Sequence, residues 1–316
     1  MTEFGYALSS EEHPPNDLIR WARLAEESGF GFALISDHFH PWIDEQGHSP
    51  FVWSVIGAIA HATERIRLGT GVTCPMIRIH PAIVAHAAAT SAALMPGRFF
   101  LGVGTGENLN EHVLGDKWPA ADERLEMLEE AIAVMRTLWE GGEQTFRGGW
   151  YEVEDARLYT LPEEPVPVYV AAAKPLAAEL AGRVGDGLIS TVPEKDVVAS
   201  YREGGGDGPR YGMVTCCWAE SEADAKQTAH RVWPNSAIRG DLTQELPRPA
   251  HFMQAAQMVT EDDVAESVVC GPDVERYVEQ VKAFTDAGFD HVYFHQVGRD
   301  QEGFFRFWRD ELSKRL

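Results

Sequence analysis

The sequence contains few basic residues and very little lysine. Its 316 residues include 27 basic and 49 acidic side chains, for a net charge of −22, and only six of the basic residues are lysine. Because nothing supplies a basic face, we exclude a protein that binds the phosphate backbone of nucleic acids. An acidic, lysine-poor surface is typical of solubility at high salt. An acidic enzyme with an arginine-rich codon bias would look the same, and both interpretations stay open.

Cysteine and long apolar runs are scarce as well. The four cysteines, Cys74, Cys216, Cys217 and Cys270, are too few and too scattered for a disulfide framework or a CxxC metal site. We expect them to pack in a reducing interior. No apolar run approaches ~18 residues, and the first ten residues lack the basic start and apolar stretch of a signal peptide. The sequence therefore predicts a cytoplasmic globular protein with no membrane partner.

Apolar, strand-like runs alternate with amphipathic helical stretches along the whole chain. The eight runs begin at Phe4, Gly31, Ile66, Phe99, Val166, Asp186, Tyr211 and His291. Most are continuously apolar, as strands buried on both faces should be. Helical stretches follow them, most clearly Asp122–Trp139, Pro175–Val184 and Asp273–Ala287. Eight such units predict an α/β fold of the (β/α)8 TIM barrel type, with a doubly wound sheet as the alternative.

Two long segments interrupt this alternation. Glu140–Pro165, after the fourth strand, is rich in glycine and aromatic residues and predicts a β-hairpin insertion. Asn235–Asp263, after the seventh strand, is irregular and predicts a lid over the barrel mouth. No linker, repeat or low-complexity segment divides the chain, so we expect one barrel domain over residues 1–316.

Polar residues directly follow the second predicted strand, where a barrel places its active site. The segment SDHFHPW, residues 36–42, supplies an aspartate, two histidines and a tryptophan. This combination suits proton transfer beside an aromatic surface. A turn in which Asp37 caps the next segment while Trp42 packs in the core would produce the same string, and that alternative stays open.

Small residues follow three further strands. Gly69–Pro75 and Gly102–Asn110 carry alternating glycines, which let the backbone approach a ligand closely. Tight turns and dinucleotide-binding loops give similar strings, although a dinucleotide loop is expected after the first strand rather than the fourth. Ala171–Pro175 leads into a helix amino end, which is a common anion site. Four such segments at successive strand ends indicate one ligand site.

The segments SDHFHPW, LGTGVTCP, GRFFLGVGTGENLNE, VPVYVAAAKP and AGRVGDGLIST together resemble the luciferase-like superfamily of flavin and deazaflavin barrels. Within it, the chain is most similar to the F420-dependent glucose-6-phosphate dehydrogenase family, and the resemblance covers nearly its whole length. It implies coenzyme F420, a deazaflavin hydride carrier, as the cofactor. It also implies a homodimer.

The resemblance assigns cofactor contacts residue by residue. By similarity, Asp37 holds a ring edge, and the family's non-prolyl cis peptide falls at Gly71–Val72. The implied cofactor-binding residues are Asp37, Gly71, Val72, Thr73, Cys74, Gly106, Glu107, Asn110, Ala171, Ala172, Ala173, Lys174 and Thr191. Lys174 departs from the glycine that relatives often carry, so we expect it to meet the phosphate or glutamate tail of F420. A solvated surface lysine is the alternative.

The resemblance also implies a catalytic set. His38 matches the histidine that acts as base on the substrate hydroxyl, Trp42 is the neighbouring aromatic residue, and Glu107 is the carboxylate near the deazaflavin. His40, where relatives often carry glutamine, is expected to face the substrate together with Trp42. Lys195 and Gln254 complete the predicted substrate residues.

The likeness to sugar-phosphate enzymes weakens at the substrate phosphate. Those relatives hold it with two lysines and an arginine, whereas the corresponding places here are Glu194 or Lys195, Gln254 and Ser267. At most one cation remains, although several donors or positive charges usually meet a phosphate. We therefore predict that glucose 6-phosphate is not the substrate, unless arginines such as Arg239 or Arg248 replace the missing cations.

These observations predict an F420-dependent oxidoreductase that moves a hydride between the cofactor and an alcohol or sugar carbon, or the corresponding carbonyl. Two alternatives remain. An FMN-dependent monooxygenase of the same superfamily would need a reductase partner, and the GTGE and SDHFHPW segments disfavour it. A non-catalytic cofactor-binding barrel is disfavoured because His38 and Glu107 are both present.

Overall fold

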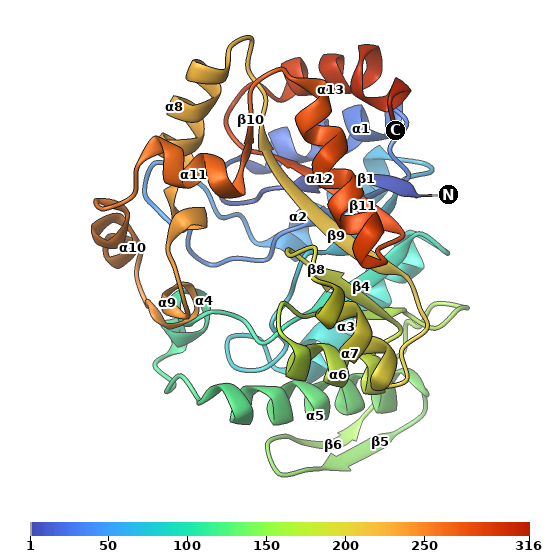
Figure 1. Ribbon diagram of the computed structural model, residues 1–316. Coiled ribbons are helices and arrows are strands. Elements are labelled where there is room, and N and C mark those ends of the chain that lie inside the picture. Colours follow the sequence, from blue (N-terminus) through green and yellow to red (C-terminus); the bar gives the residue numbers. More distant parts are fainter. Residues whose placement is uncertain (1) are drawn as a thin grey trace.

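The computed structural model describes residues 2–316 (Figure 1). Its centre is a closed ring of eight parallel strands. The ring runs β1-β2-β3-β4-β7-β8-β9-β11 and closes because β11 pairs with β1. Its strands are β1 (Glu3–Leu8), β2 (Phe32–Ile35), β3 (Arg67–Thr70), β4 (Phe99–Val103), β7 (Val168–Ala171), β8 (Gly187–Ser190), β9 (Arg210–Cys217) and β11 (His291–Gln296). Each predicted run overlaps one of these strands. The (β/α)8 barrel is confirmed, and the doubly wound sheet is wrong.

Large side chains fill the barrel on the side away from the carboxyl ends of the strands. Phe32, Phe100, Tyr169, Tyr211 and Tyr293 come from five different strands and form one buried cluster. The rings of Phe100 and Tyr211 stack at 5.4 Å between centroids, and those of Tyr169 and Tyr211 at 5.2 Å. This aromatic layer closes the barrel toward the amino ends of the strands, so that a ligand has access from their carboxyl ends.

Helices cover the outside of the ring (Figure 1). The larger ones are α1 (Pro15–Glu27), α2 (Val52–Ala62), α3 (Pro81–Leu94), α5 (Ala121–Trp139), α6 (Pro175–Val184), α7 (Lys195–Glu203), α8 (Glu222–Val232), α12 (Val274–Ala287) and α13 (Gln301–Asp310). The three helices predicted most clearly from the sequence agree with α5, α6 and α12 to within one residue. Short turns of 3₁₀ helix are η1 (His112–Leu114) and η3 (Leu312–Lys314).

Helix α12 illustrates why these stretches form helices. Its buried residues Tyr277, Val281 and Phe284 are spaced by four and three positions, so they share one face. The side chain of Asp273 accepts a hydrogen bond from the backbone of Glu275 and caps the first turn. The helix ends at Gly288, whose φ of +105° is the left-handed conformation that glycine adopts most readily.

The insertion after β4 contains the predicted hairpin. Strands β5 (Gln144–Arg147) and β6 (Glu152–Ala156) pair antiparallel and project beyond α5 (Figure 1). The carboxylate of Glu130 on α5 accepts hydrogen bonds from three successive backbone amides, those of Gly149, Trp150 and Tyr151. One carboxylate therefore fixes the hairpin turn against the helix.

Part of the segment between β9 and β11 borders the barrel mouth at Gln244, and its role as a lid stays a prediction. After α8 it forms η2 (Pro234–Ala237), α9 (Leu242–Glu245), α10 (Pro249–Ala256), α11 (Glu261–Ser267) and β10 (Val269–Cys270). Figure 1 shows α9 and α10 on the same side of the molecule as α4 (Asn108–Glu111), the short helix after β4. The side-chain amide of Asn108 donates to the backbone oxygen of Glu245 at 2.9 Å. The two-residue strand β10, which pairs with β9 outside the ring, is not predicted by the sequence.

The four cysteines are buried and unoxidised, in agreement with the packing role expected from the sequence. None of the helices described between residues 2 and 316 combines the length and the apolar character that a bilayer crossing requires.

Candidate active site

A cavity of about 280 Å³ lies at the carboxyl ends of the barrel strands. Two groups of lining residues differ in chemistry. The small-residue group is Gly71, Val72, Gly104, Gly106, Ala171, Ala172 and Ala173. The histidine group is Glu11, His38, Trp42, Trp233 and His295. Both groups border the same space, so a ligand that fills the cavity touches both.

The small-residue group follows β3, β4 and β7, where the sequence predicts close approach of the backbone. The peptide bond between Gly71 and Val72 is cis, which confirms the expectation from the family resemblance. A Cβ atom at Gly104 would lie 2.8 Å from Cγ2 of Val72, so only glycine fits between these two loops. Gly106 has a φ of +69°, the left-handed conformation. Gly104 is needed for space and Gly106 for its backbone conformation, and the result is a surface with few side chains.

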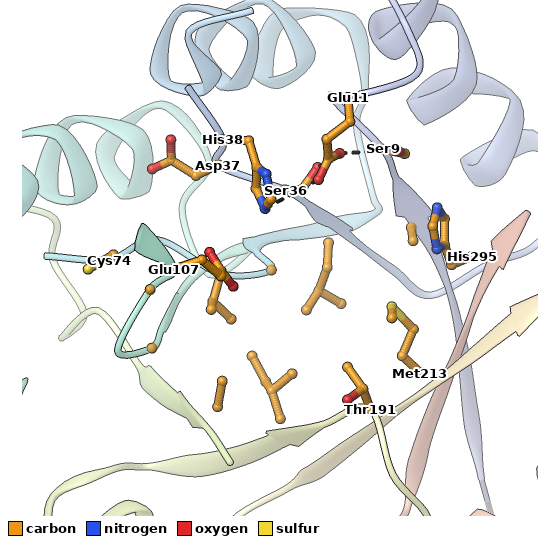
Figure 2. A pocket seen from close by; sticks show the side chains of 18 of the residues that line it. Ser9, Glu11, Ser36, Asp37, His38, Cys74, Glu107, Thr191, Met213 and His295 are labelled. Carbon is orange, nitrogen blue, oxygen red and sulfur yellow. Dashed lines mark hydrogen bonds and ion pairs between the residues drawn. The ribbon is translucent and has the colours of Figure 1, made fainter. Parts of the chain in front are cut away.

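Four predicted polar residues also line the cavity. Figure 2 shows Asp37, Cys74 and Glu107 on one side of the space, with Thr191 across from them. Burial raises the pKa of the Cys74 thiol well above its ordinary value, and the nearby carboxylates of Glu111 and Glu107 act in the same direction. Cys74 therefore lines the cavity as an uncharged thiol.

His38 and Glu11 form a pair within the histidine group (Figure 2). Nε2 of His38 lies 3.3 Å from Oε1 of Glu11, and their side chains are 10% and 3% exposed. On the other side of the ring, Nδ1 lies 3.2 Å from the backbone oxygen of His40. A carbonyl oxygen only accepts hydrogen bonds, so Nδ1 carries a hydrogen, and Nε2, which faces the Glu11 carboxylate, is the nitrogen that can gain or lose a proton.

Glu11 is fixed by two serines. Oε2 accepts a hydrogen bond from Ser36 at 2.6 Å and another from Ser9 at 3.1 Å. Burial alone would raise the pKa of Glu11, but the positive charge on His38 and the hydrogen bond from Ser36 outweigh it and lower the pKa below its ordinary value. Glu11 is therefore a carboxylate held in place beside the catalytic histidine candidate.

Asp37 and Glu111 share the buried Arg78. Nη2 of Arg78 donates to Oδ1 of Asp37 at 2.9 Å, and its backbone amide donates to Oε2 of Glu111 at 2.8 Å. The hydroxyl of Thr73 donates to Oδ2 of Asp37 at 2.8 Å. Thr73 thus supports a lining residue without being one of the lining residues itself.

The remaining predicted site residues lie outside the cavity lining. Asn110 accepts hydrogen bonds from the backbone amides of Phe39 and His40, and Nδ1 of His40 lies 3.0 Å from the backbone oxygen of Leu109. Asn110 and His40 therefore hold the loop that carries His38. Their direct contact with cofactor or substrate stays a prediction.

Three predicted polar side chains, Lys174, Lys195 and Gln254, are exposed. Lys174 forms an ion pair with Asp241, next to α9, at 2.7 Å, which joins the rim of β7 to the lid segment. Lys195 begins α7, and Gln254 lies on α10, whose buried Phe252 packs against Trp42 at 5.2 Å between ring centroids. None of the three lines the cavity, so contact of Lys174 with the cofactor tail and of Lys195 and Gln254 with the substrate stays a prediction.

Sequence reasoning missed several lining residues. Glu11 follows β1, Met213 is on β9 and His295 is on β11, while Trp233 and Gln244 come from the segment after α8. The rule applied to the second to sixth strands, that polar residues at strand ends face the site, would have found Glu11 and His295 as well. Trp233 and Gln244 carry no local signal, because a folded loop brings them in.

Comparison with known proteins assigns the family. The family model for luciferase-like monooxygenases matches residues 1–291. The chain is 36% identical, over 99% of its length and 97% of the relative's, to an F420-dependent glucose-6-phosphate dehydrogenase from Microbacterium testaceum. It is also 36% identical to the enzyme of the same name from Nocardia farcinica, over 99% of this chain and 98% of that one.

A solved structure resembles the whole chain. An F420-dependent secondary alcohol dehydrogenase, in complex with an F420-acetone adduct, superposes with a TM-score of 0.90 at 29% identity. The match covers 98% of this chain and 97% of that one. With the barrel, the cis peptide and the whole-length similarity in agreement, the chain belongs to the luciferase-like family.

Proposed function

We propose that this protein is an F420-dependent oxidoreductase that moves a hydride between the cofactor and the carbon of a neutral alcohol, or of the corresponding carbonyl. The observation that carries the proposal is that the His38–Glu11 pair and the small-residue group border one cavity. The whole-length similarity to F420-dependent dehydrogenases supports the cofactor. We also propose one barrel domain over residues 1–316, a homodimer and a cytoplasmic location.

The lining residues fit a flat ring system. Gly104, Gly106 and Ala171–Ala173 leave one part of the cavity without bulky side chains. Asp37 and Glu107 offer acceptors for the N–H and O–H groups of such a ring, and we propose that they hold it with Thr191. F420, when bound, accepts or donates a hydride. The protein must bind that cofactor, exclude water from the reacting carbon and move the hydroxyl proton.

His38 is the residue in position to take that proton. Hydride can leave an alcohol carbon only as the hydroxyl proton leaves, so a base within hydrogen-bond reach is required. Nε2 is the ring nitrogen that can gain the proton, because Nδ1 donates to the oxygen of His40. When Nε2 gains the proton, the Glu11 carboxylate 3.3 Å away stabilises the imidazolium. In the reverse direction the same ring returns the proton to the carbonyl oxygen.

The charge of the cavity favours a neutral substrate. The ionisable side chains lining it, within residues 2–316, are Glu11, Asp37, His38, Cys74, Glu107, Glu111, Tyr293 and His295. Carboxylates repel a phosphate dianion, whereas a neutral hydroxyl donates to one group and accepts from another. The aromatic rings of Trp42 and Trp233 add an apolar surface for the rest of the molecule. This charge distribution supports a neutral alcohol, free sugar or ketone over glucose 6-phosphate.

Two measurements test the proposal. Titration of the purified protein with F420 and with FMN, followed by fluorescence, identifies the cofactor, and we expect tight binding of F420 only. Addition of propan-2-ol, glycerol, glucose or glucose 6-phosphate to the F420 complex should then reduce the cofactor with at least one neutral alcohol. Preferential FMN binding with oxygen consumption would support a monooxygenase instead. F420 binding without turnover of any alcohol would support a non-catalytic barrel.

A further inference from the structure

Arg78 is a buried cation directly behind the cavity. It lies in the segment between β3 and α3, and its side chain is 7% exposed, while those of Asp37 and Glu111 are each 1% exposed. Among the described residues it is the one arginine or lysine that pairs with carboxylates of the cavity lining. Arg78 is not itself a lining residue, so any effect on a ligand passes through Asp37 and Glu111.

The contacts of Arg78 fix both carboxylates. Its Nη2 donates to Oδ1 and to the backbone oxygen of Asp37, at 2.9 and 3.2 Å. Its Nε approaches Oε1 of Glu111 at 3.5 Å, in addition to the 2.8 Å hydrogen bond from its backbone amide. Arg78 stays charged, because Asp37 and Glu111 outweigh the effect of burial and raise its pKa. The network therefore keeps a permanent positive charge directly behind two carboxylates of the cavity lining.

Two carboxylates, those of Asp37 and Glu111, contact that charge, and a third, that of Glu107, lies near Glu111. Asp37, Glu107 and Glu111 all line the cavity near the small-residue group. Burial, together with the charges of Glu107 and Asp37, raises the pKa of Glu111 despite the opposing effect of Arg78. Arg78 thus pairs with two of these three carboxylates, those of Asp37 and Glu111. A ligand that gains negative charge in this place depends strongly on that cation.

Hydride transfer to a deazaflavin adds two electrons and one proton, so the ring becomes one unit more negative unless a further proton follows. We infer that Arg78 is a positioning residue which, through Asp37 and Glu111, favours the reduced form of bound F420 over the oxidised form. The inference rests on the cofactor of the proposed function and on no particular substrate. It assigns to Arg78 a role in setting the reduction potential of the bound cofactor.

The test is the ratio of the dissociation constant of oxidised F420 to that of reduced F420, measured by titration without turnover. In Arg78→Met we expect this ratio to fall at least tenfold, and each tenfold corresponds to about 30 mV in the two-electron potential of the bound couple. Arg78→Lys keeps the charge but loses the forked geometry. It should weaken both forms while the ratio stays within about threefold of wild type.

A second variant covers the case in which Arg78→Met does not fold, because that substitution leaves Asp37 and Glu111 buried without a cation. Glu111→Gln removes a negative charge instead, so the ratio should rise, and adding it to Arg78→Met should return the ratio toward wild type. Arg67→Met is the matched control. Arg67 begins β3 at the opposite end of the barrel and pairs with Glu3, so its loss should leave the ratio unchanged.

The outcomes are distinguishable. Opposite shifts in the Arg78 and Glu111 variants, with cooperative thermal unfolding retained, support the inference. Equal changes in both dissociation constants for every folded variant overturn it and leave a structural role for Arg78, with the proposed function intact. Failure of the wild-type protein to bind either form of F420 overturns the proposed function and this inference together.

Discussion

The small-residue group and the histidine group border the same cavity but are built in different ways. The small-residue group consists of short runs, such as Gly71–Val72 and Ala171–Ala173, in which the backbone itself forms the surface. The histidine group depends on side chains that contact each other across the fold, such as His38 and Glu11, which are 27 positions apart. A short run of small residues can be recognised from the local sequence. A contact between two side chains far apart in the chain cannot be recognised in this way.

We propose ring binding for the small-residue group and proton transfer for the histidine group, so substitutions should separate the two functions. The largest effect is expected for His38→Ala. Loss of a proton-transfer group typically lowers the rate about 10²–10⁴-fold, and we expect kcat to fall by this amount while F420 still binds. His61→Ala is the control, because His61 is exposed on α2 and is not among the residues that line the cavity. If His38→Ala keeps near-normal turnover, the base lies elsewhere.

Glu11→Gln should have the next largest effect. A hydrogen bond to a charged group contributes about 1.5–3 kcal/mol, so the loss of the carboxylate beside Nε2 should lower kcat roughly 10- to 100-fold. The glutamine keeps the shape and an acceptor for Ser36. Steady-state kinetics with a saturating alcohol, together with an F420 titration, check this prediction. A change in F420 affinity without a change in kcat would move Glu11 into the cofactor-binding set.

Gln244→Lys adds a positive charge to the cavity and so tests whether the carboxylates of the lining disfavour a phosphorylated substrate. Gln244 lines the cavity and accepts a hydrogen bond from Arg124 at 3.2 Å. A lysine there supplies a cation, so we expect kcat/KM for glucose 6-phosphate to rise about tenfold. Gln244→Met, of similar length and uncharged, is the control. An equal rise with free glucose would show that size rather than charge limits the substrate.

The smallest expected effect is on the acid stability of the protein, to which the two buried glutamates Glu11 and Glu111 contribute differently. The lowered pKa of Glu11 stabilises the folded protein above the ordinary value of 4.5, and this stability is lost as the pH falls through the folded-state pKa. The pKa of Glu111 is raised, so its ionisation penalises the folded protein above 4.5 and the penalty disappears as the pH falls. The contributions of Glu11 and Glu111 to the pH dependence of stability therefore have opposite signs.

Thermal unfolding from about pH 7 to about pH 3 measures this contrast. As the pH falls, the stability of wild type relative to Glu11→Gln should decrease. Its stability relative to Glu111→Gln should increase. Parallel changes in the two variants would contradict the assigned environments.

Most of the fold could be predicted because its signals are local. Buried parallel strands such as β2 and β4 are continuously apolar, and amphipathic helices such as α12 have one buried face. Strand β10 was missed because two residues contain no periodic pattern. The lid segment was located, but its helices are short and held by tertiary contacts, such as that between Asn108 and Glu245.

The site was predicted unevenly for the same reason. His38, Asp37 and Glu107 stand directly after apolar strands, where a barrel places its chemistry. The role of Arg78 depends on Asp37 and Glu111, which are 41 and 33 positions away, and no spacing rule connects them. Trp233 likewise depends on the path of the chain after α8. These contacts are consequences of closing the barrel.

The most direct measurement of the central claim compares neutral alcohols with their phosphorylated counterparts: glucose with glucose 6-phosphate, and glycerol with glycerol 3-phosphate. The purified protein with F420 is assayed for cofactor reduction, and kcat/KM is determined for each member of a pair. The carboxylate-lined cavity predicts that the neutral member of any reacting pair is the better substrate by at least about tenfold. A higher kcat/KM for the phosphorylated member, or no reduction of F420 by any alcohol, would contradict the account.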